Sequence, residues 1–369
     1  MDLSKGILNM RKEELKNDIG IITFHRTTNF GSCLQAYALY RKIQILGYNC
    51  EFIDYRCQAI EKRENLDVKI FSGGLKNIIK NILFLPGYKK KADSLNKFFE
   101  SRVCLSKPFY KENIKKAIYK NYIVGSDIVW GRDITDYDYT YFLDFVKCGS
   151  RKNAFASSMG DCTAEKDKDK IINLLTNFDN IAVREKDAQE WLENLMGKHI
   201  DWVCDPTMLL DKNEWIENIP LTMYNDKFVL IYFRDPEGKC INDAKEYAKQ
   251  HNLKVYYVNY EKSISGVKNI KPSSLSEFLG LIMSAKMIFT ASYHGMLFSL
   301  YFNKEMIFYT RAHSSRMISL AKRLGIEHRW GNLQDIFSIE DIDYEIVNKK
   351  IEEFRDTSTK ILIKMIKGD

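Results

Sequence analysis

A strand, a polar turn and a long helix follow one another near the N-terminus, and this segment limits the fold most. Residues 19–25 are predicted to form the strand, residues 26–31 the turn and residues 32–46 the helix. Gly47 stands where a helix C-terminal glycine is expected, and residues 50–55 predict a second strand. Because a βαβ unit pairs its strands in parallel, the turn after the first strand faces the ligand crevice of the sheet.

The polar residues of this turn are therefore the first candidates for chemistry or binding. They are His25, Arg26, Asn29 and Gly31, with the helix N-terminus directed toward them. The turn is not a dinucleotide-binding fingerprint, because only Gly31 is a glycine and a pyrophosphate needs a closer backbone approach.

Strands and helices keep alternating along the rest of the chain. Further strands are predicted at residues 121–124, 153–158, 181–183, 202–207, 228–233, 254–258, 287–291 and 306–309. Helices are predicted at residues 186–195, 242–250, 275–285, 296–301, 314–324 and 346–366. This order predicts an α/β fold with two Rossmann-like domains facing a cleft. We expect an N-terminal extension (1–18), one domain at 19–210, another at 226–345 and a C-terminal helix at 346–369.

Length and composition agree with two ordinary domains. The chain has 369 residues, of which 45% are hydrophobic, and contains no apolar run long enough to span a bilayer. We therefore expect a cytoplasmic protein. Its eight cysteines contain no CxxC pair, so we expect free thiols that serve packing, and no metal site.

Positive charge is concentrated between residues 60 and 120, which contain fifteen Lys or Arg and only six acidic residues. Residues 75–83 carry apolar side chains at helical spacing, and Pro86 and Gly87 are predicted to end this helix. Two interpretations stay open: an ordinary surface helix, or a surface that contacts the inner face of the membrane or attracts an anionic substrate. No nucleic-acid-binding motif accompanies the charge, so we expect no nucleic acid partner.

Several short motifs occur in a fixed order along residues 19–330. They are Phe24 to Asn29 with Gly31 and residues 34–39, Val124-Gly-Ser-Asp127 with Trp130, Val183-Arg-Glu185, Asp205-Pro-Thr207, Ser292-Tyr-His-Gly295 with Phe298 and Ser299, and Ser315-Arg316 before Leu324-Gly325. In this order and spacing, the chain resembles the polysaccharide pyruvyl transferase family.

The resemblance implies a fold and a reaction. Members of that family resemble GT-B glycosyltransferases, which have two Rossmann-like domains. They transfer pyruvate from phosphoenolpyruvate onto two hydroxyls of a sugar as a ketal in surface polysaccharide biosynthesis, and release phosphate. The sugar acceptor is either carried on a lipid or part of a finished chain. The reaction needs no organic cofactor, and the donor's negative charges call for cations or helix N-termini rather than a metal.

The family's catalytic histidine falls on His294. An imidazole both gives and takes protons near neutral pH, and this one follows a predicted strand. A structural histidine is the alternative.

The donor-binding arginine of related enzymes falls on Arg184, with an ion pair to Glu185 or Asp187 as the alternative. Some members carry an arginine where this chain has Ser292. Arg316 or Arg311 are candidates for the missing charge, Arg316 first, together with amides near Gly295.

Asn29, Gln35, Asp127 and Tyr293 are the candidate acceptor-binding residues. The two amides suit sugar hydroxyls, Asp127 suits the orientation or deprotonation of one, and Tyr293 could stack on a sugar ring. Turn, capping and core roles are the alternatives. Two other functions also stay open: a GT-B glycosyltransferase that uses a nucleotide sugar, and a non-catalytic module that binds glycans or anions.

Overall fold

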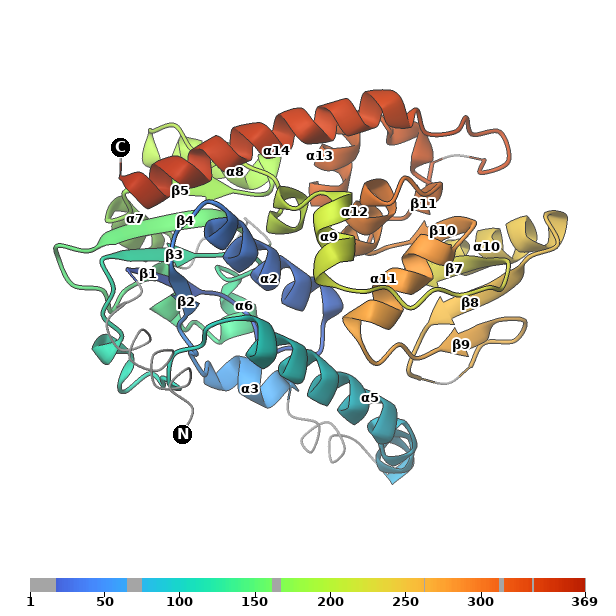
Figure 1. Ribbon diagram of the computed structural model, residues 1–369, viewed down its shortest axis with the longest axis horizontal. Coiled ribbons are helices and arrows are strands. Elements are labelled where there is room, and N and C mark those ends of the chain that lie inside the picture. Colours follow the sequence, from blue (N-terminus) through green and yellow to red (C-terminus); the bar gives the residue numbers. More distant parts are fainter. Residues whose placement is uncertain are drawn as a thin grey trace, which may run out of the picture.

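Two α/β halves lie side by side in the computed structural model, and each contains one parallel sheet (Figure 1). The structure describes residues 18–64, 75–160, 167–261, 263–311, 315–333 and 335–368, without the side chains of residues 75–84. The predicted α/β class with two Rossmann-like sheets is thus confirmed. Most of the expected N-terminal extension, Cys162 and the apolar face of residues 75–83 lie outside this description. The predicted domain limits stay a prediction.

The first half is built on a six-stranded sheet in the order β2-β1-β3-β4-β5-β6. Every neighbouring pair in it is parallel. Its strands are β1 (Ile19–Ile22), β2 (Cys50–Phe52), β3 (Asn121–Val124), β4 (Arg151–Ser157), β5 (Asn180–Val183) and β6 (Asp201–Trp202). Its helices are α2 (Phe30–Ile45), α3 (Gln58–Glu64), α5 (Leu75–Arg102), α6 (Arg132–Thr135), α7 (Lys168–Thr176) and α8 (Lys186–Met196), with short 3₁₀ turns η1 (Ile114–Lys116) and η2 (Tyr139–Phe142).

The second half is built on a five-stranded parallel sheet in the order β11-β10-β7-β8-β9. Its strands are β7 (Phe228–Tyr232), β8 (Lys254–Val258), β9 (Lys268–Ile270), β10 (Met287–Thr290) and β11 (Met306–Phe308). The helices α10 (Lys239–Gln250), α11 (Leu275–Ser284), α12 (Tyr293–Tyr301) and α13 (Ser315–Leu324) belong to it, with 3₁₀ turn η4 (Glu327–Arg329). The connection between the sheets holds η3 (Pro206–Leu209) and α9 (Lys212–Asn218).

The order of strands reverses once in each sheet. In the first sheet β1 lies between β2 and β3, and in the second β7 lies between β8 and β10. Ligands of open parallel sheets bind at such reversal points, beyond the carboxyl ends of the strands. The segments that follow β1, β3, β7 and β10 are therefore the first places to look for a site.

One hydrophobic core crosses from the first half to the second. Phe30 of α2 stacks on Phe278 of α11, with ring centroids 4.5 Å apart. Trp215 of α9 contacts both Tyr37 of α2 and Phe298 of α12. Because these rings are buried from water between the halves, their burial holds the two sheets in a fixed relation.

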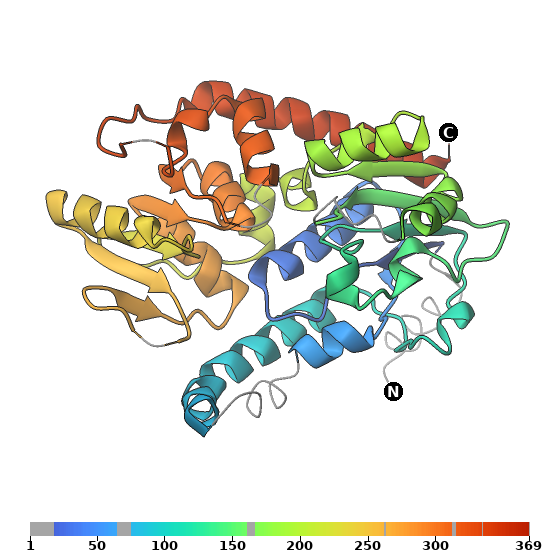
Figure 2. The ribbon, with the colours of Figure 1, turned by 180° about the vertical axis from the view of Figure 1, so that it is seen from behind.

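The C-terminal helix α14 (Tyr344–Lys367) runs across the first half and reaches the second (Figures 1 and 2). At its start the Tyr344 hydroxyl donates to the carbonyl of Lys304 in the second half. Near its end the Asn121 amide, on β3, donates to the carbonyl of Met365 at 3.0 Å. The predicted terminal helix is present, and it forms hydrogen bonds with both halves.

Pro86 does not end the basic helix as predicted. Helix α5 continues through it to Arg102. A proline inside a helix removes one hydrogen bond, but the turns that follow it gain tertiary contacts. Tyr88 stacks on Tyr260 of the second half at 5.0 Å, and Phe99 is buried against Phe52. This packing outweighs the local preference of proline.

Among the helices that begin earlier than predicted, α2 and α12 carry site residues. Helix α2 starts at Phe30 because the Asn29 side chain accepts a hydrogen bond from the N–H of Gly31 and so caps it. Helix α12 starts at Tyr293, where Ser292 is the cap. His294 and Gly295 therefore belong to the first turn of a helix and not to a loop.

Candidate active site

Three ionisable side chains from different strand ends meet between the halves. Arg184 follows β5, Asp205 follows β6, and His294 lies in the first turn of α12 after β10. His294 Nε2 lies 3.6 Å from Asp205 Oδ2, and Arg184 Nη1 lies 3.0 Å from the same oxygen. Asp205 thus joins the predicted catalytic histidine to the predicted donor-binding arginine.

The imidazole of His294 is held by a close approach of α2. A Cβ atom added at Gly31 would lie 2.1 Å from His294 Nδ1, which no real contact allows. Only glycine fits this position of α2, because the ring occupies the space of the missing side chain. The N-terminal turn of α2 in the first half therefore positions a side chain of the second half.

Arg184 is completely buried among three carboxylates. Its guanidinium contacts Asp205 at 3.0 Å, Glu185 at 3.1 Å and Asp127 at 3.6 Å. Burial alone would lower the pKa of Arg184, but the three carboxylates raise it above its usual value. The ion pair with Glu185 that the sequence left as an alternative is present. Any donor substrate bound at Arg184 would therefore share the guanidinium with these acids.

Tyr293 lies between two guanidinium groups. The centre of its ring is 5.8 Å from the Arg184 guanidinium and 5.2 Å from that of Arg316, which begins α13. Burial and the charge of Arg184 lower the pKa of Arg316. Tyr293 is itself buried, with both guanidinium groups near its ring, and its stacking on a sugar ring stays a prediction.

The carboxyl groups of the site hold protons to different degrees. Burial favours protonation of all three, but the charges of Arg184 and His294 and nearby donors leave the pKa values of Asp127 and Asp205 lower than usual. For Glu185 burial prevails over Arg184 and Arg316, and its pKa is raised. Such separation of neighbouring carboxyls is a common property of sites that move protons.

Several buried polar atoms of this cluster have no hydrogen-bond partner within the described residues. They are His294 Nε2, Arg184 Nη2 and Glu185 Oε2. Two of these atoms lie 3.6 Å from a carboxylate oxygen, Nε2 from Asp205 and Nη2 from Asp127, which is longer than a hydrogen bond. They therefore keep the capacity to hydrogen-bond a ligand.

Asp127 is the predicted acceptor residue that belongs to this cluster. The Ser32 hydroxyl on α2 donates to its carboxylate, and Arg184 lies 3.6 Å from it. Its backbone is in the left-handed region, with φ of 70°. The neighbouring Gly125 has φ of 118°, and an added Cβ would lie 2.3 Å from the carbonyl oxygen of Phe155. The turn after β3 therefore needs glycine to bring Asp127 to this place.

Gln35 has a structural role. It is fully buried, donates to the carbonyl of Ser32 at 2.9 Å and accepts from the N–H of Ser126 at 3.2 Å. Its amide links α2 to the loop after β3, and its acceptor-binding role stays a prediction. Asn29 is exposed, and its side-chain oxygen accepts from the Gly31 N–H at 2.8 Å.

Ser292 and Gly295, predicted to bind the donor substrate, have structural roles in α12. The Ser292 hydroxyl accepts from the Gly295 N–H at 3.3 Å, so this amide is already engaged. A Cβ at Gly295 would lie 2.4 Å from the Thr290 hydroxyl, which explains the glycine by packing. Arg311 is exposed and lies apart from the buried cluster, against the ring of Phe233 at 5.1 Å.

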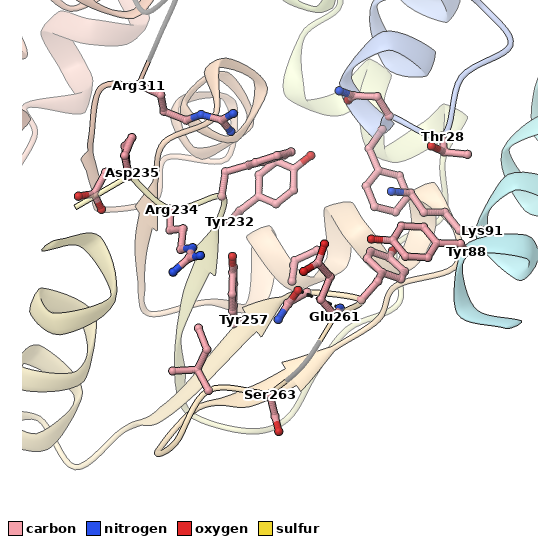
Figure 3. Close-up of a pocket in the computed structure, with 18 of the residues that line it drawn as sticks. Thr28, Tyr88, Lys91, Tyr232, Arg234, Asp235, Tyr257, Glu261, Ser263 and Arg311 are labelled. Carbon is pink, nitrogen blue, oxygen red and sulfur yellow. Dashed lines mark hydrogen bonds between the residues drawn. The ribbon is translucent and has the colours of Figure 1, made fainter. Parts of the chain in front are cut away.

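A pocket opens beside this cluster. It has a volume of about 820 Å³ and is lined by residues of both halves, among them Asn29, Phe30, Tyr232, Arg234 and Arg311 (Figure 3). His294 is not part of its wall. Phe30 precedes the Gly31 that contacts His294, and Tyr232 contacts Gly295 and Ser292, so one layer of residues separates the pocket from the cluster.

The polar turn that begins the chain's first βαβ unit is partly structural. His25 Nε2 lies 2.9 Å from Asp54 Oδ1, and Arg26 and Arg56 bond the same carboxylate. The sequence missed Asp205, Ser32 and Ser126 as site residues; the Ser126 hydroxyl accepts from Arg184 Nη1 at 3.2 Å. Asp205 stood in one of the recognised motifs, but its proline neighbour suggested only the end of a strand.

Other expectations concern the chain as a whole. The seven cysteines that the structure describes form no disulfide with one another. Within the described ranges, side chains suited to a metal ion do not gather in groups of three. No described helix is both long and apolar enough to cross a bilayer.

The architecture is that of a GT-B-like protein, with two Rossmann-like halves and a charged site between them. S. aureus MnaA, solved with UDP, has this fold: its TM-score is 0.52 and its identity 11%, over 95% of this chain and 96% of that one. UDP-GlcNAc 2-epimerases from Methanocaldococcus jannaschii (TM-score 0.48, 12% identity, 95% and 99% coverage) and Neisseria meningitidis (0.47, 11%, 95% and 99%) are also similar. No curated protein sequence matches.

The family follows from a sequence match. The model of the polysaccharide pyruvyl transferase family matches residues 29–313. The chain therefore belongs to the polysaccharide pyruvyl transferase family, and is a transferase of polysaccharide pyruvylation. The resemblance stated from the motifs is confirmed. The matched range includes His294, Arg184, Asp205 and Asp127.

Proposed function

We propose that this protein transfers pyruvate from phosphoenolpyruvate to two hydroxyls of a sugar, as a ketal in surface polysaccharide biosynthesis. One observation carries the proposal: His294, Asp205 and Arg184 form a buried cluster of ion pairs between the two halves, in which His294 Nε2 and Arg184 Nη2 have no hydrogen-bond partner within the described residues. The family match gives pyruvylation, and this cluster offers the groups that such a donor requires.

The reaction begins with a proton transfer. Protonated His294 gives a proton to the methylene carbon of phosphoenolpyruvate, so that the central carbon becomes electrophilic. The first sugar hydroxyl bonds to that carbon and loses its proton. The C–O bond to phosphate then breaks, the second hydroxyl closes the ring, and its proton leaves. One proton gained by carbon and one taken by phosphate balance the two lost by the hydroxyls.

Asp205 supports His294 in both directions of proton transfer. Its carboxylate is fully buried and faces the imidazole Nε2 at 3.6 Å. A negative charge there stabilises the imidazolium and fixes the ring. Asp127, held by Ser32, is the proposed group to orient or deprotonate a sugar hydroxyl.

Arg184 and Arg316 are the proposed donor-binding residues. Both contact the ring of Tyr293, and Arg184 Nη2 has no hydrogen-bond partner in the described structure. Guanidinium groups bind carboxylate and phosphate through paired hydrogen bonds. Arg316, half-buried at the start of α13, is the proposed substitute for the arginine that Ser292 replaces. No cofactor or metal takes part in this scheme.

The substrates suggest the place of action. We propose that the protein works in the cytoplasm, where phosphoenolpyruvate is made, on a sugar acceptor that is either lipid-linked or part of a chain. The charge of residues 60–120 would favour contact with the anionic inner face of a membrane.

Donor selection tests the proposal against its two rivals. The purified chain is given phosphoenolpyruvate or UDP-galactose, each with a galactoside acceptor, and release of phosphate or UDP is measured. Phosphate release that depends on the acceptor supports the proposal. Use of UDP-galactose alone would make the protein a glycosyltransferase, a reading that the UDP complex of MnaA makes worth testing. Binding without turnover of either donor would indicate a binding module.

A further inference from the structure

Asp205 has different partners at its two carboxylate oxygens. Oδ2 lies 3.6 Å from His294 Nε2 and accepts from Arg184 Nη1 at 3.0 Å. Oδ1 accepts twice from Thr207, from its N–H at 2.9 Å and from its hydroxyl at 2.7 Å. Because the two oxygens belong to one rigid group, the hydrogen bonds at Oδ1 also determine where Oδ2 lies. Thr207 therefore sets the direction in which Asp205 presents its charge to the imidazole.

A tyrosine hydroxyl extends this network. Tyr301 Oη lies 3.1 Å from Thr207 Oγ1, and the geometry allows either group to donate. Burial opposes the ionisation of Asp205, but His294 and nearby donors keep its pKa below the usual value, so its oxygens accept. Thr207 gives its one hydroxyl proton to Asp205, and Tyr301 must then be the donor to Thr207. The hydrogen bonds thus run from Tyr301 through Thr207 to Asp205.

The whole network is buried. Asp205 and Thr207 have no exposed surface, and Tyr301 is 5% exposed. Burial, together with the charge of Asp205, raises the pKa of Tyr301 well above its usual value, so the phenol keeps the proton that it donates. Hydrogen bonds away from water are strong, and water does not readily replace one that is lost. The orientation of Asp205 therefore depends on both hydroxyls.

Both ends of the network belong to one helix. His294 and Tyr301 lie seven residues apart in α12. Seven residues are close to two helical turns, so the two side chains leave the same face of the helix, about 10 Å apart along its axis. Helix α12 thus reaches Asp205 twice, directly through His294 and indirectly through Tyr301 and Thr207. A shift of the carboxylate relative to the imidazole would have to break one of these contacts.

Other contacts hold Thr207 and Tyr301 without using their hydroxyls. Trp215 Nε1 donates to the backbone carbonyl of Thr207 at 3.0 Å. The ring of Tyr301 packs against Phe298, with centroids 5.3 Å apart. Substitutions that remove only a hydroxyl therefore keep the packing of η3 and α12, and they isolate the effect on Asp205.

Further charges surround the imidazole and its partners. The titratable and charged groups there are Asp205, Asp127, Arg184, Glu185, Tyr293 and Arg316. The first turn of α2, which packs against the ring, contributes the uncharged Gly31 and Ser32. A loss of the Thr207 or Tyr301 hydroxyl changes none of these charges and acts on His294 through the direction of Asp205.

We propose that Thr207 and Tyr301 are positioning residues, whose hydrogen-bond relay holds the Asp205 carboxylate toward His294. The inference rests on the proposed function and deepens it, because it names the residues that prepare the acid for proton transfer. Without the relay, Asp205 turns away from the imidazole and the imidazolium loses part of its stabilisation. The enzyme then loses its protonated acid at a lower pH.

Hydroxyl deletions test the relay: Thr207→Val, Tyr301→Phe and the two together. Tyr309→Phe is the control, because it also removes a buried tyrosine–carboxylate hydrogen bond, to Asp243 at 2.7 Å in the second half. Thr207→Val should lower kcat about tenfold and Tyr301→Phe about threefold. The alkaline limb of the kcat profile should move to lower pH by about half a unit or more in both. The control should keep the rate and the profile.

The double variant shows whether the two residues act as one unit. Because Tyr301 acts through the Thr207 hydroxyl, the double variant should be no slower than Thr207→Val alone. Thr207→Ser keeps the hydroxyl and should restore most of the rate and the pH profile. Should Thr207→Val fail to fold, Tyr301→Phe and Thr207→Ser carry the test. Losses that multiply in the double variant would overturn the relay, as would slower variants with an unchanged pH profile.

An NMR titration separates this inference from the proposed reaction. Protein labelled at its histidines is titrated without substrate, and the His294 signal is identified by its loss in His294→Ala. The midpoint of that signal should move to lower pH in Thr207→Val and Tyr301→Phe, but not in Tyr309→Phe. If the midpoint moves while the wild type never uses phosphoenolpyruvate, the proposed function fails and the relay stands. An unchanged midpoint in both hydroxyl variants overturns the relay.

Discussion

Individual residues of the site act through their neighbours as much as through their own chemistry. Asp205 shows this best, because one carboxylate oxygen faces both His294 and Arg184 while the other accepts from the Thr207 N–H at 2.9 Å. Removal of its charge would leave the imidazolium without its partner and the guanidinium with two acids instead of three.

Asp205→Asn should therefore lower kcat by about a hundredfold or more. The amide oxygen can still accept from Thr207, so the fold should survive with a loss of about 1–3 kcal/mol in the free energy of unfolding. Steady-state kinetics with phosphoenolpyruvate and thermal unfolding measure both quantities. A variant that keeps the wild-type rate would show that Asp205 has no part in the mechanism.

The sequence identified some of these residues and not others, for physical reasons. His294 and Arg184 were identified through the family resemblance, and Asp127 by its residue type in a loop that follows a strand of a parallel sheet. Asp205 was missed because its distance to His294 is a property of the fold. Gln35 and Tyr293 were assigned to the acceptor by residue type, which says nothing about burial.

At the scale of elements, the first turn of α2 decides the geometry of the site. Gly31 is helical and leaves space for His294, so a methyl group there must displace the imidazole. The sequence predicted this helix and its approach to the crevice, but not the contact with the other half.

Gly31→Ala should lower kcat/KM by about tenfold or more, since small displacements of a catalytic group reduce the rate strongly. Gly87→Ala in α5 is the matched control, because its added Cβ meets side chains only at 3.7 Å. Helical alanine should there stabilise by about 0.4–1 kcal/mol with no loss of activity. Equal activity of both variants would contradict the proposed role of Gly31.

Helix α5 marks the limit of prediction at this scale. Pro86 is a reliable sign of a helix end when only local bonds matter. Here Tyr88 and Phe99, which follow Pro86, pack on both halves. Such contacts between distant segments cannot be predicted from the spacing of apolar residues along the sequence.

For the whole molecule, α14 is the element that holds the two halves in a fixed relative position. It contacts the second half through Tyr344 and the first through Asn121, and in between Ser358 accepts from the Cys204 N–H at 2.9 Å. Sequence periodicity predicted this helix, but not its course across both sheets.

A chain that ends at Asp343 should therefore be strongly destabilised, because it exposes the apolar surface that α14 covers. Calorimetry should show a lower melting temperature, and the halves should no longer unfold in one common transition. A truncated chain that melts like the full one would show that α14 does not couple the halves.

Acid should unfold the protein through its buried carboxylates. Charged or hydrogen-bonding partners leave the pKa values of Asp127, Asp138 and Asp205 below the usual value, although burial opposes this. Their stabilisation is complete above the unfolded-state value of about 3.9 and is lost as the pH falls toward the folded-state values. Glu185, whose pKa is raised, has the opposite effect: its contribution to the free energy of unfolding increases as the pH falls.

Urea unfolding between about pH 7 and pH 2 measures this dependence. The free energy of unfolding should decline below about pH 4, where these aspartates begin to bind protons in the unfolded chain. A constant value down to about pH 2 would contradict these assignments.

The central claim is that His294 drives transfer of pyruvate from phosphoenolpyruvate to a sugar. Phosphoenolpyruvate labelled in its pyruvyl carbons is incubated with a galactoside acceptor, and the label in the acceptor and the released phosphate are both measured. The wild type should place one label in the acceptor for each phosphate released. His294→Ala should lose about a thousandfold or more of this rate while it unfolds at a similar temperature. Transfer at a near-normal rate by the folded variant, or phosphate release that leaves no label in the acceptor, would contradict the account.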